Sequence, residues 1–314
     1  MALAGNQVIH DFSPFFKVYE DGRIEKKKDF LPPGHVPTGS DPTKPVPPGL
    51  DPKTGVQTRD VVVSTQTGVS ARIFLPKTTV PGQKLPLLVH YHGGGFCIGS
   101  PFDAIIHSFL TSLVTLTNAV AISVDYRLAP EHRLPIAYDD SWAALQWIAT
   151  HSTGQGPEPW LNEHADLKRV FLVGESSGAN IAHYVAVRAG ATGLVGLNIN
   201  GLIIAHPFFG TAEVDGLYKF ICPTSSGRDD DPKLNPAVDP DLAKLGCEKV
   251  LVCVAEKDRL RERGVAYYET LRSSGWGGTV KLVESKGEEH CFHIFNSSKA
   301  VPLLNEMADF IMAP

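Results

Sequence analysis

The sequence predicts an α/β fold in which a mostly parallel sheet carries helices on both faces, and three observations support this prediction. Short β-branched runs come first, at 60–64, 70–75 and 85–91. From residue 119 onward, strand-like runs alternate with segments of helical periodicity. The chain has 314 residues and 43% hydrophobic content, which is enough for one large domain. Strands followed by βαβ repeats are typical of a parallel, helix-covered sheet.

The alternation continues to the end of the chain. We expect further strands at 119–125, 169–173, 201–205, 249–255 and 279–283, and helices at 137–151, 179–188, 263–273 and 301–312. Two stretches do not fit this pattern. Residues 31–52 carry eight prolines, which exclude a long helix or a central strand, and 208–241 form a long excursion rich in Asp, Pro and Gly. The prediction is one domain over 1–314, with 1–55 and 208–241 contributing a cap or lid.

Composition excludes several classes of function. The chain has 29 Lys and Arg against 34 Asp and Glu, for a net charge of −5, which argues against a nucleic-acid partner. Its five cysteines are scattered and odd in number, so neither a disulfide framework nor a zinc site is indicated. The N-terminus lacks a charged segment followed by an apolar one, and no apolar run suits a membrane span. We therefore expect a cytoplasmic protein without a membrane partner.

The candidate nucleophile is Ser176, in the G-x-S-x-G motif Gly174–Gly178. The motif follows the apolar run 169–173 directly and precedes the helical segment 179–188. A strand that turns sharply into a helix at a serine presents the hydroxyl on a strained elbow, with glycines where the backbone must approach closely.

A serine nucleophile needs a histidine to take its proton and an acid to orient that histidine. Asp258 follows the strand-like run 249–255, and His290 follows the last one. Both come just after strand ends, where residues far apart in sequence meet at one edge of a parallel sheet. His293 is a rival base, but His290 comes first after the turn. The two histidines have no third ligand at a suitable spacing, so we expect no metal.

The segment His92–Phe96, H-G-G-G-F, is the candidate oxyanion hole. Its glycines let backbone N–H groups point into the site without obstruction by side chains. We expect Gly94 and Gly95 to donate, with Ser177 as the third donor.

Other positions have predicted roles around this site. The charges of Asp125–Glu131 are expected to brace the loop beneath the oxyanion turn rather than touch substrate. Glu175 either tunes the site electrostatically or pairs with a buried arginine or tyrosine, and the sequence does not decide between the two. Four phenylalanines are expected to line an apolar pocket, namely Phe16, Phe96, Phe208 and Phe292.

Taken together, the motifs resemble those of the plant carboxylesterases of the hormone-sensitive-lipase group, in the α/β-hydrolase superfamily. The resemblance is carried by His92–Phe96, Val124–Glu131, Gly174–Ala182, Ala255–Asp258 and Glu289–His293. It implies an eight-stranded sheet, a cap built partly from the N-terminal region, and the roles given above for the serine, acid, base and glycines.

The resulting expectation is a serine carboxylesterase that hydrolyses esters of small apolar or aromatic molecules through an acyl-enzyme, without a cofactor. Two alternatives use the same site. The 2-hydroxyisoflavanone dehydratases of this group act on phenolic ligands, and some carry threonine where this chain has Ser176. The gibberellin receptors resemble this chain but have lost the triad histidine, so His290 argues against a hormone receptor.

Overall fold

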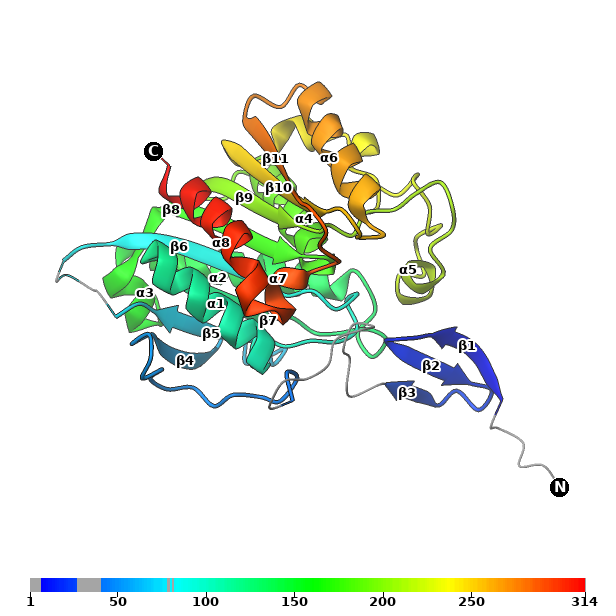
Figure 1. Cartoon of the computed structure of the whole chain (residues 1–314), viewed down its shortest axis with the longest axis horizontal. Coiled ribbons are helices and arrows are strands. Elements are labelled where there is room, and N and C mark those ends of the chain that lie inside the picture. The colour runs from blue at the N-terminus through cyan, green and yellow to red at the C-terminus, as the bar shows by residue number, and fades with distance from the viewer. Residues whose placement is uncertain (1–6, 27–40, 78–79, 81, 314) are drawn as a thin grey trace.

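An eight-stranded sheet forms the centre of the molecule (Figure 1). The computed structural model describes residues 7–26, 41–77, 80 and 82–313. The strand order is β11-β10-β9-β8-β6-β7-β5-β4; β6 to β11 run parallel, and β4 and β5 are antiparallel to their neighbours. The strands are β4 (Gln57–Val62), β5 (Ser70–Leu75), β6 (Leu85–Tyr91), β7 (Val120–Asp125), β8 (Ala165–Glu175), β9 (Ile199–Ala205), β10 (Lys249–Ala255) and β11 (Thr279–Ser285). The predicted mostly parallel sheet is confirmed.

Helices cover both faces of this sheet, also as predicted. One face packs against α1 (Ala104–Thr117), α7 (Phe292–Phe295) and α8 (Ser297–Met312). The other packs against α2 (Ile136–Ala149), α4 (Ser177–Thr192) and α6 (Arg261–Ser273). The shorter helices are α3 (Pro159–His164), α5 (Gly216–Ile221) and three 3₁₀ turns at Thr150–Thr153, Pro236–Val238 and Leu242–Lys244.

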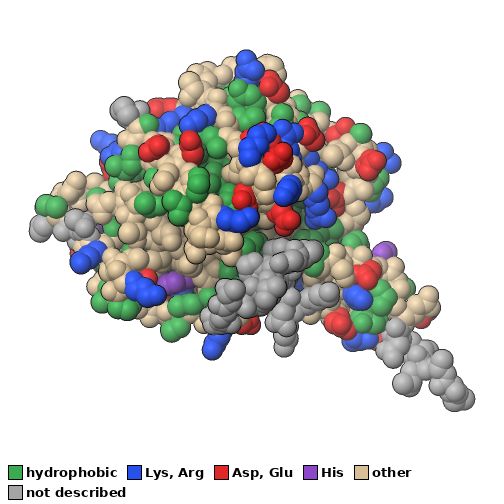
Figure 2. All heavy atoms as spheres, viewed as in Figure 1, with side chains coloured by type: hydrophobic (Ala, Val, Ile, Leu, Met, Phe, Trp, Pro, Cys, Tyr) green, Lys and Arg blue, Asp and Glu red, His purple; other side chains and the backbone are tan. Residues whose placement is uncertain are grey.

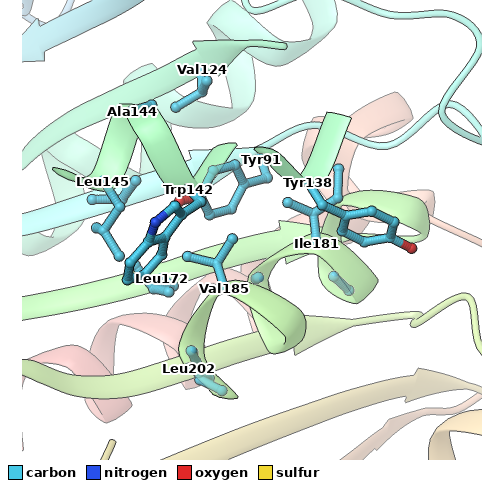
Figure 3. Close-up of a cluster of buried hydrophobic side chains, with 14 of the residues drawn as sticks. Tyr91, Val124, Tyr138, Trp142, Ala144, Leu145, Leu172, Ile181, Val185 and Leu202 are labelled. Carbon is cyan, nitrogen blue, oxygen red and sulfur yellow. The ribbon is translucent and has the colours of Figure 1, made fainter. Parts of the chain in front are cut away.

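The core between the sheet and the helices α2 and α4 is one of two buried apolar layers. Figure 3 shows Tyr91 of β6 and Leu172 of β8 facing Trp142 of α2 and Val185 of α4. The central strands are covered on both faces, so they read as continuous apolar runs rather than alternating ones. Buried apolar layers thus flank the central strands on both faces.

A second, three-stranded antiparallel sheet lies beside the main body, next to α5 (Figure 1). It consists of β1 (Val8–Phe12), β2 (Phe16–Tyr19) and β3 (Ile24–Lys26). The rings of Phe12 and Phe16 lie 5.0 and 5.8 Å from the ring of Phe220 in α5. Lys26 also forms an ion pair of 2.6 Å with Glu131. The N-terminal segment is thus joined to two distant parts of the chain.

The proline-rich stretch agrees with the sequence prediction in the part that the structure describes. Residues 41–52 form turns and isolated bridges, without a helix or a long strand, while the remainder of the predicted stretch, 31–40, lies outside the described residues.

On the face in Figure 2, Lys and Arg side chains are interspersed with Asp and Glu. Within the described residues, we find no helix with the length and apolar character needed to cross a bilayer.

Candidate active site

Ser176 occupies the sharp turn between β8 and α4. Its backbone angles, φ 55° and ψ −119°, lie in a region that residues with a side chain seldom adopt, so the turn is strained. A Cβ atom at Gly178 would collide with the carbonyl oxygen of Tyr91, and one at Gly174 would collide with the backbone of Gly178. The two motif glycines are therefore required by close backbone packing, and the turn carries the hydroxyl at the edge of the sheet.

The structure brings the three predicted triad side chains together. His290 Nε2 lies 3.0 Å from Ser176 Oγ, and His290 Nδ1 lies 2.7 Å from Asp258 Oδ2. Asp258 follows β10 and His290 follows β11, so both occupy the carboxyl edge of the sheet. The Asp258 side chain is buried, which alone would raise its pKa, but hydrogen bonds from His206 and His290 outweigh burial and hold the pKa below its usual range. Asp258 is therefore an ionised carboxylate.

His206, which the sequence analysis did not single out, also contacts Asp258. Its Nδ1 lies 3.3 Å from the same Oδ2 atom that accepts from His290. His206 is the first residue after β9, the strand beside β10, and it is fully buried. The signal in the sequence that could have identified His206 is its position as a polar residue directly after a strand at this edge. Ligand atoms of His206, Asp258 and His290 lie within 4.8 Å of one another, and the carboxylate accepts hydrogen bonds from both imidazoles and from the Leu260 N–H.

The rival base, His293, is not placed beside the nucleophile. It is buried, its ring stacks on that of His206 with centroids 5.2 Å apart, and it meets Phe109 edge-on. Among the described residues neither ring nitrogen of His293 has a hydrogen-bond partner. Burial, reinforced by neighbouring histidines, lowers its pKa well below the usual range, so His293 is a neutral packing residue.

The glycine loop after β6 runs directly beside Ser176. A Cβ atom at Gly93 would lie 3.3 Å from Ser176 Cβ. Gly94 and Gly95 have φ values of 112° and 60°, and a side chain at Gly94 would collide with the carbonyl of Ile98. Within the described part of the chain the N–H groups of Gly94 and Gly95 have no acceptor. Ser177 is the first residue of α4, where backbone N–H groups have no partner within the helix.

Glu175 anchors this loop from below. Its Oε1 accepts a hydrogen bond of 2.7 Å from the Gly93 N–H, and its Oε2 lies 2.9 Å from His90 Nε2. His90 Nδ1 in turn lies 2.8 Å from the Ser123 hydroxyl. The partner is therefore a histidine and a backbone amide, and not the arginine or tyrosine considered from the sequence. A buried carboxylate thereby ties the nucleophile turn to the glycine loop.

The segment Asp125–Glu131 braces the same loop, but through a hydroxyl and a backbone amide rather than through its charges, which the sequence analysis had expected to do so. The Tyr126 hydroxyl donates to the carbonyl of His92 over 2.6 Å, and the Ala129 N–H donates to the carbonyl of Phe96 over 2.8 Å. Arg127 forms a two-pronged ion pair with Asp140. The first two contacts hold the glycine loop, and the Arg127 side chain binds a protein carboxylate.

A cavity of about 870 Å³ opens beside Ser176 and His290. Of the four predicted lining residues only Phe208 contributes. The prediction is wrong for the other three, whose rings are buried against protein: Phe16 packs on Phe220, Phe96 on Tyr138 and Tyr218, and Phe292 on His206. The wall formed by the N-terminal segment and the 208–241 excursion is instead lined by Phe12, Phe15, Leu217, Tyr218 and Ile221.

Polar and thiol groups complete the cavity wall. Asp103 lies on it, and burial raises the pKa of its carboxyl to about 7. Cys97 and Cys291 also line it. Burial raises the pKa of Cys97 to about 12, so this thiol stays protonated and acts as a small apolar group.

Comparison with known proteins agrees with the fold and the motifs. Residues 88–294 match the family model described as the alpha/beta hydrolase fold, and the chain belongs to this family. Within it the chain is of the carboxylesterase type. Probable carboxylesterase 2 of Arabidopsis thaliana is 43% identical, over 99% of this chain and 98% of the relative. The 2-hydroxyisoflavanone dehydratase of Glycyrrhiza echinata is 40% identical, over 98% and 97%.

Solved structures give the same result. A hyperthermophilic esterase from the archaeon Pyrobaculum calidifontis has a TM-score of 0.66 and 27% identity, covering 81% of this chain and 85% of its own. An arylesterase with a TM-score of 0.68 and 23% identity, covering 86% of each chain, shares the fold. The resemblance to plant carboxylesterases drawn from the motifs is confirmed.

Proposed function

We propose that this protein is a serine carboxylesterase whose nucleophile is Ser176, whose base is His290 and whose orienting acid is Asp258. The observation that carries the proposal is the continuous hydrogen-bond chain from Ser176 Oγ through His290 to the ionised Asp258. Such a chain activates a hydroxyl that is otherwise a weak nucleophile at neutral pH.

In the first half of the reaction, Ser176 Oγ attacks the carbonyl carbon of a bound ester while His290 Nε2 takes the hydroxyl proton. The carbonyl oxygen becomes an oxyanion, which the N–H groups of Gly94, Gly95 and Ser177 stabilise. The intermediate then collapses, and His290 returns the proton to the departing alkoxide. An alcohol leaves, and the acyl group stays on Ser176.

In the second half, a water molecule replaces the alcohol. His290 takes a proton from this water as the hydroxide attacks the acyl carbon, and the same donors hold the second oxyanion. Collapse breaks the bond to Ser176 Oγ, which regains its proton from His290, and the carboxylic acid leaves. Throughout, Asp258 keeps the proton on Nδ1, so Nε2 always faces the reacting groups.

The substrates proposed are esters of small apolar or aromatic molecules. The cavity is of the size that holds such ligands, and aromatic and aliphatic side chains line much of it. Residues 11–15 of the N-terminal segment and 215–218 of the 208–241 excursion contribute to its wall. We assign these two segments to the cap that selects the substrate.

A fluorophosphonate probe and an ester panel together test this function. The phosphonyl group is expected to add to Ser176, with the modified peptide identified by mass spectrometry, and short-chain p-nitrophenyl esters are expected to be hydrolysed. If the probe labels another residue or nothing, the nucleophile is misassigned. If it labels Ser176 while no ester in the panel turns over, the hydrolase proposal fails.

Dehydration of a hydroxylated flavanone is the second candidate function, because relatives of nearly equal identity bear carboxylesterase and 2-hydroxyisoflavanone dehydratase names. In that reaction His290 removes a carbon-bound proton, the oxyanion donors polarise the ketone, and water leaves. Ser176 then serves only as a hydrogen-bonding group. Dehydration that survives Ser176→Ala, in a chain without esterase activity, would favour this candidate.

Substitution of Gly94 by alanine is expected to lower kcat for p-nitrophenyl esters about 10²- to 10³-fold, the usual effect of losing one oxyanion donor. The added methyl group collides with the carbonyl of Ile98 at a φ of 112°, so the loop must move. The matched control is Gly68→Ala, which has a similar positive φ, of 77°, but open space around the new Cβ. If the two variants had equal rates, the assignment of Gly94 as an oxyanion donor would be wrong.

A further inference from the structure

The carboxylate of Asp258 accepts three hydrogen bonds. Oδ1 accepts from the Leu260 N–H over 2.8 Å, and Oδ2 accepts from His290 over 2.7 Å and from His206 over 3.3 Å. The triad as proposed needs only the bond to His290. The bond from His206 is thus an additional, buried contact on the one oxygen that orients the base.

His206 is held in place to make this contact. Its backbone N–H donates to the carbonyl of Cys253 in β10 over 2.8 Å, and its φ of 49° is unusual for a residue with a side chain. Its ring is enclosed by Phe292, edge-on with centroids 5.8 Å apart, and by His293, stacked at 5.2 Å. A strained backbone and a closed ring environment fix one orientation, with Nδ1 toward Asp258.

The protonation of His206 follows from its surroundings. A carboxylate can only accept, so Nδ1 must carry a proton. Burial lowers the pKa of His206, and the bond to Asp258 offsets this only in part, so the ring is neutral. Other titratable groups around the cluster are His290 and His293 after β11, Glu175 at the end of β8, His90 in β6 and Arg263 in α6. His206 is therefore an uncharged donor to a charged acceptor.

We infer that His206 is a positioning residue, which fixes the Asp258 carboxylate and limits the negative charge that Oδ2 presents to His290. The inference rests on the proposed role of the triad. A donor shared on one oxygen disperses its charge, and donors that favour the ionised form keep a buried carboxylate charged. Without His206, Oδ2 would interact more strongly with His290 and favour its imidazolium form. His290 would then be protonated, and unable to act as a base, up to a higher pH.

The test is the pH dependence of two reactions in His206→Phe, compared with the wild-type chain. The acid limb of kcat/KM for a p-nitrophenyl ester, and that of fluorophosphonate labelling at Ser176, are expected to move to higher pH by roughly half a unit or more. We expect kcat to fall about tenfold, as for the loss of one hydrogen bond to a charged group, with KM nearly unchanged.

Three further variants separate positioning from packing. The side-chain amide of His206→Asn reaches the place of Nδ1. This variant is expected to show the acid limb of its pH profile at the wild-type position. The amide of His206→Gln reaches the place of Nε2 and is expected to behave like phenylalanine, which keeps the test decisive if the phenylalanine variant does not fold. His293→Phe, in the same buried cluster but without a bond to Asp258, is expected to leave the limb in place.

The inference would be overturned if the acid limb did not shift in His206→Phe and His206→Gln, or if it shifted equally in His293→Phe. The proposal of ester hydrolysis would be unaffected by either result. A wild-type chain that is labelled at Ser176 but hydrolyses no ester would instead overturn the proposed function. In that case the labelling profile alone still decides the role of His206.

Discussion

Replacement of Ser176 by alanine is expected to lower kcat for p-nitrophenyl acetate by about 10⁴- to 10⁶-fold, the range found when a triad nucleophile is removed. The loss is large because no acyl-enzyme can form, while binding and the oxyanion donors remain. The residual rate should exceed that of the uncatalysed reaction for the same reason. Initial rates with purified protein, at substrate concentrations spanning KM, give kcat and KM separately.

The matched control for this experiment is Ser108→Ala, which removes an exposed hydroxyl from α1. It is expected to keep the wild-type rate and the wild-type melting temperature. A rate for Ser176→Ala within tenfold of the control would contradict the assignment of Ser176 as nucleophile.

Asn in place of Asp258 is expected to reduce kcat about 10⁴-fold, the effect of losing the orienting acid of a triad. The amide removes the charge that stabilises the imidazolium of His290, and its N–H₂ group can donate to Nδ1 and favour the wrong tautomer. The variant should still fold, because asparagine keeps the shape of the side chain. Measurements of kcat and of circular dichroism, made on the same preparation, separate the two effects.

Asp309→Asn, an exposed change on α8, makes the same chemical substitution outside the triad and serves as the control. If Asp258→Asn retained more than a tenth of the wild-type kcat, another acid would have to orient His290.

The central strands could be predicted closely from the sequence. The predicted bounds of β5, β6 and β10 coincide with the observed ones. These strands are short, rich in apolar residues and buried along nearly their whole length, so the apolar run and the element begin and end together. Where a strand extends beyond its apolar run, as β8 does from 165 to 168, the sequence prediction was too short.

Two elements could not be predicted because their local patterns are ambiguous. The helix α1 contains Thr111, Thr115 and Thr117, residues of low helix propensity. In the helix the hydroxyls of Thr115 and Thr117 donate to carbonyls four residues earlier. The N-terminal sheet has strands of three to five residues that are largely exposed outside β2. Such strands are stabilised by partners elsewhere in the chain, which no local pattern reveals.

The same distinction applies to the site. Ser176, Asp258 and His290 could be located because turns after parallel strands converge at one edge whatever the detailed packing. The pocket could not, because the direction of a phenylalanine ring depends on its neighbours in space. Phe96 belongs to the glycine loop in sequence, yet its ring packs on Tyr138. His206 lies in an inconspicuous segment, and only the neighbouring strand supplies its partner.

The ring cluster of Phe12, Phe16 and Phe220 joins the first strands of the chain to a short helix some two hundred residues later. Neither segment supplies the proposed nucleophile, base or acid, although both form part of the wall around them. The residues proposed to select the substrate and those proposed to cleave the ester bond therefore lie in separate stretches of the chain. Related proteins can therefore acquire new substrates through substitutions in the cavity wall, while the proposed nucleophile, base and acid stay unchanged.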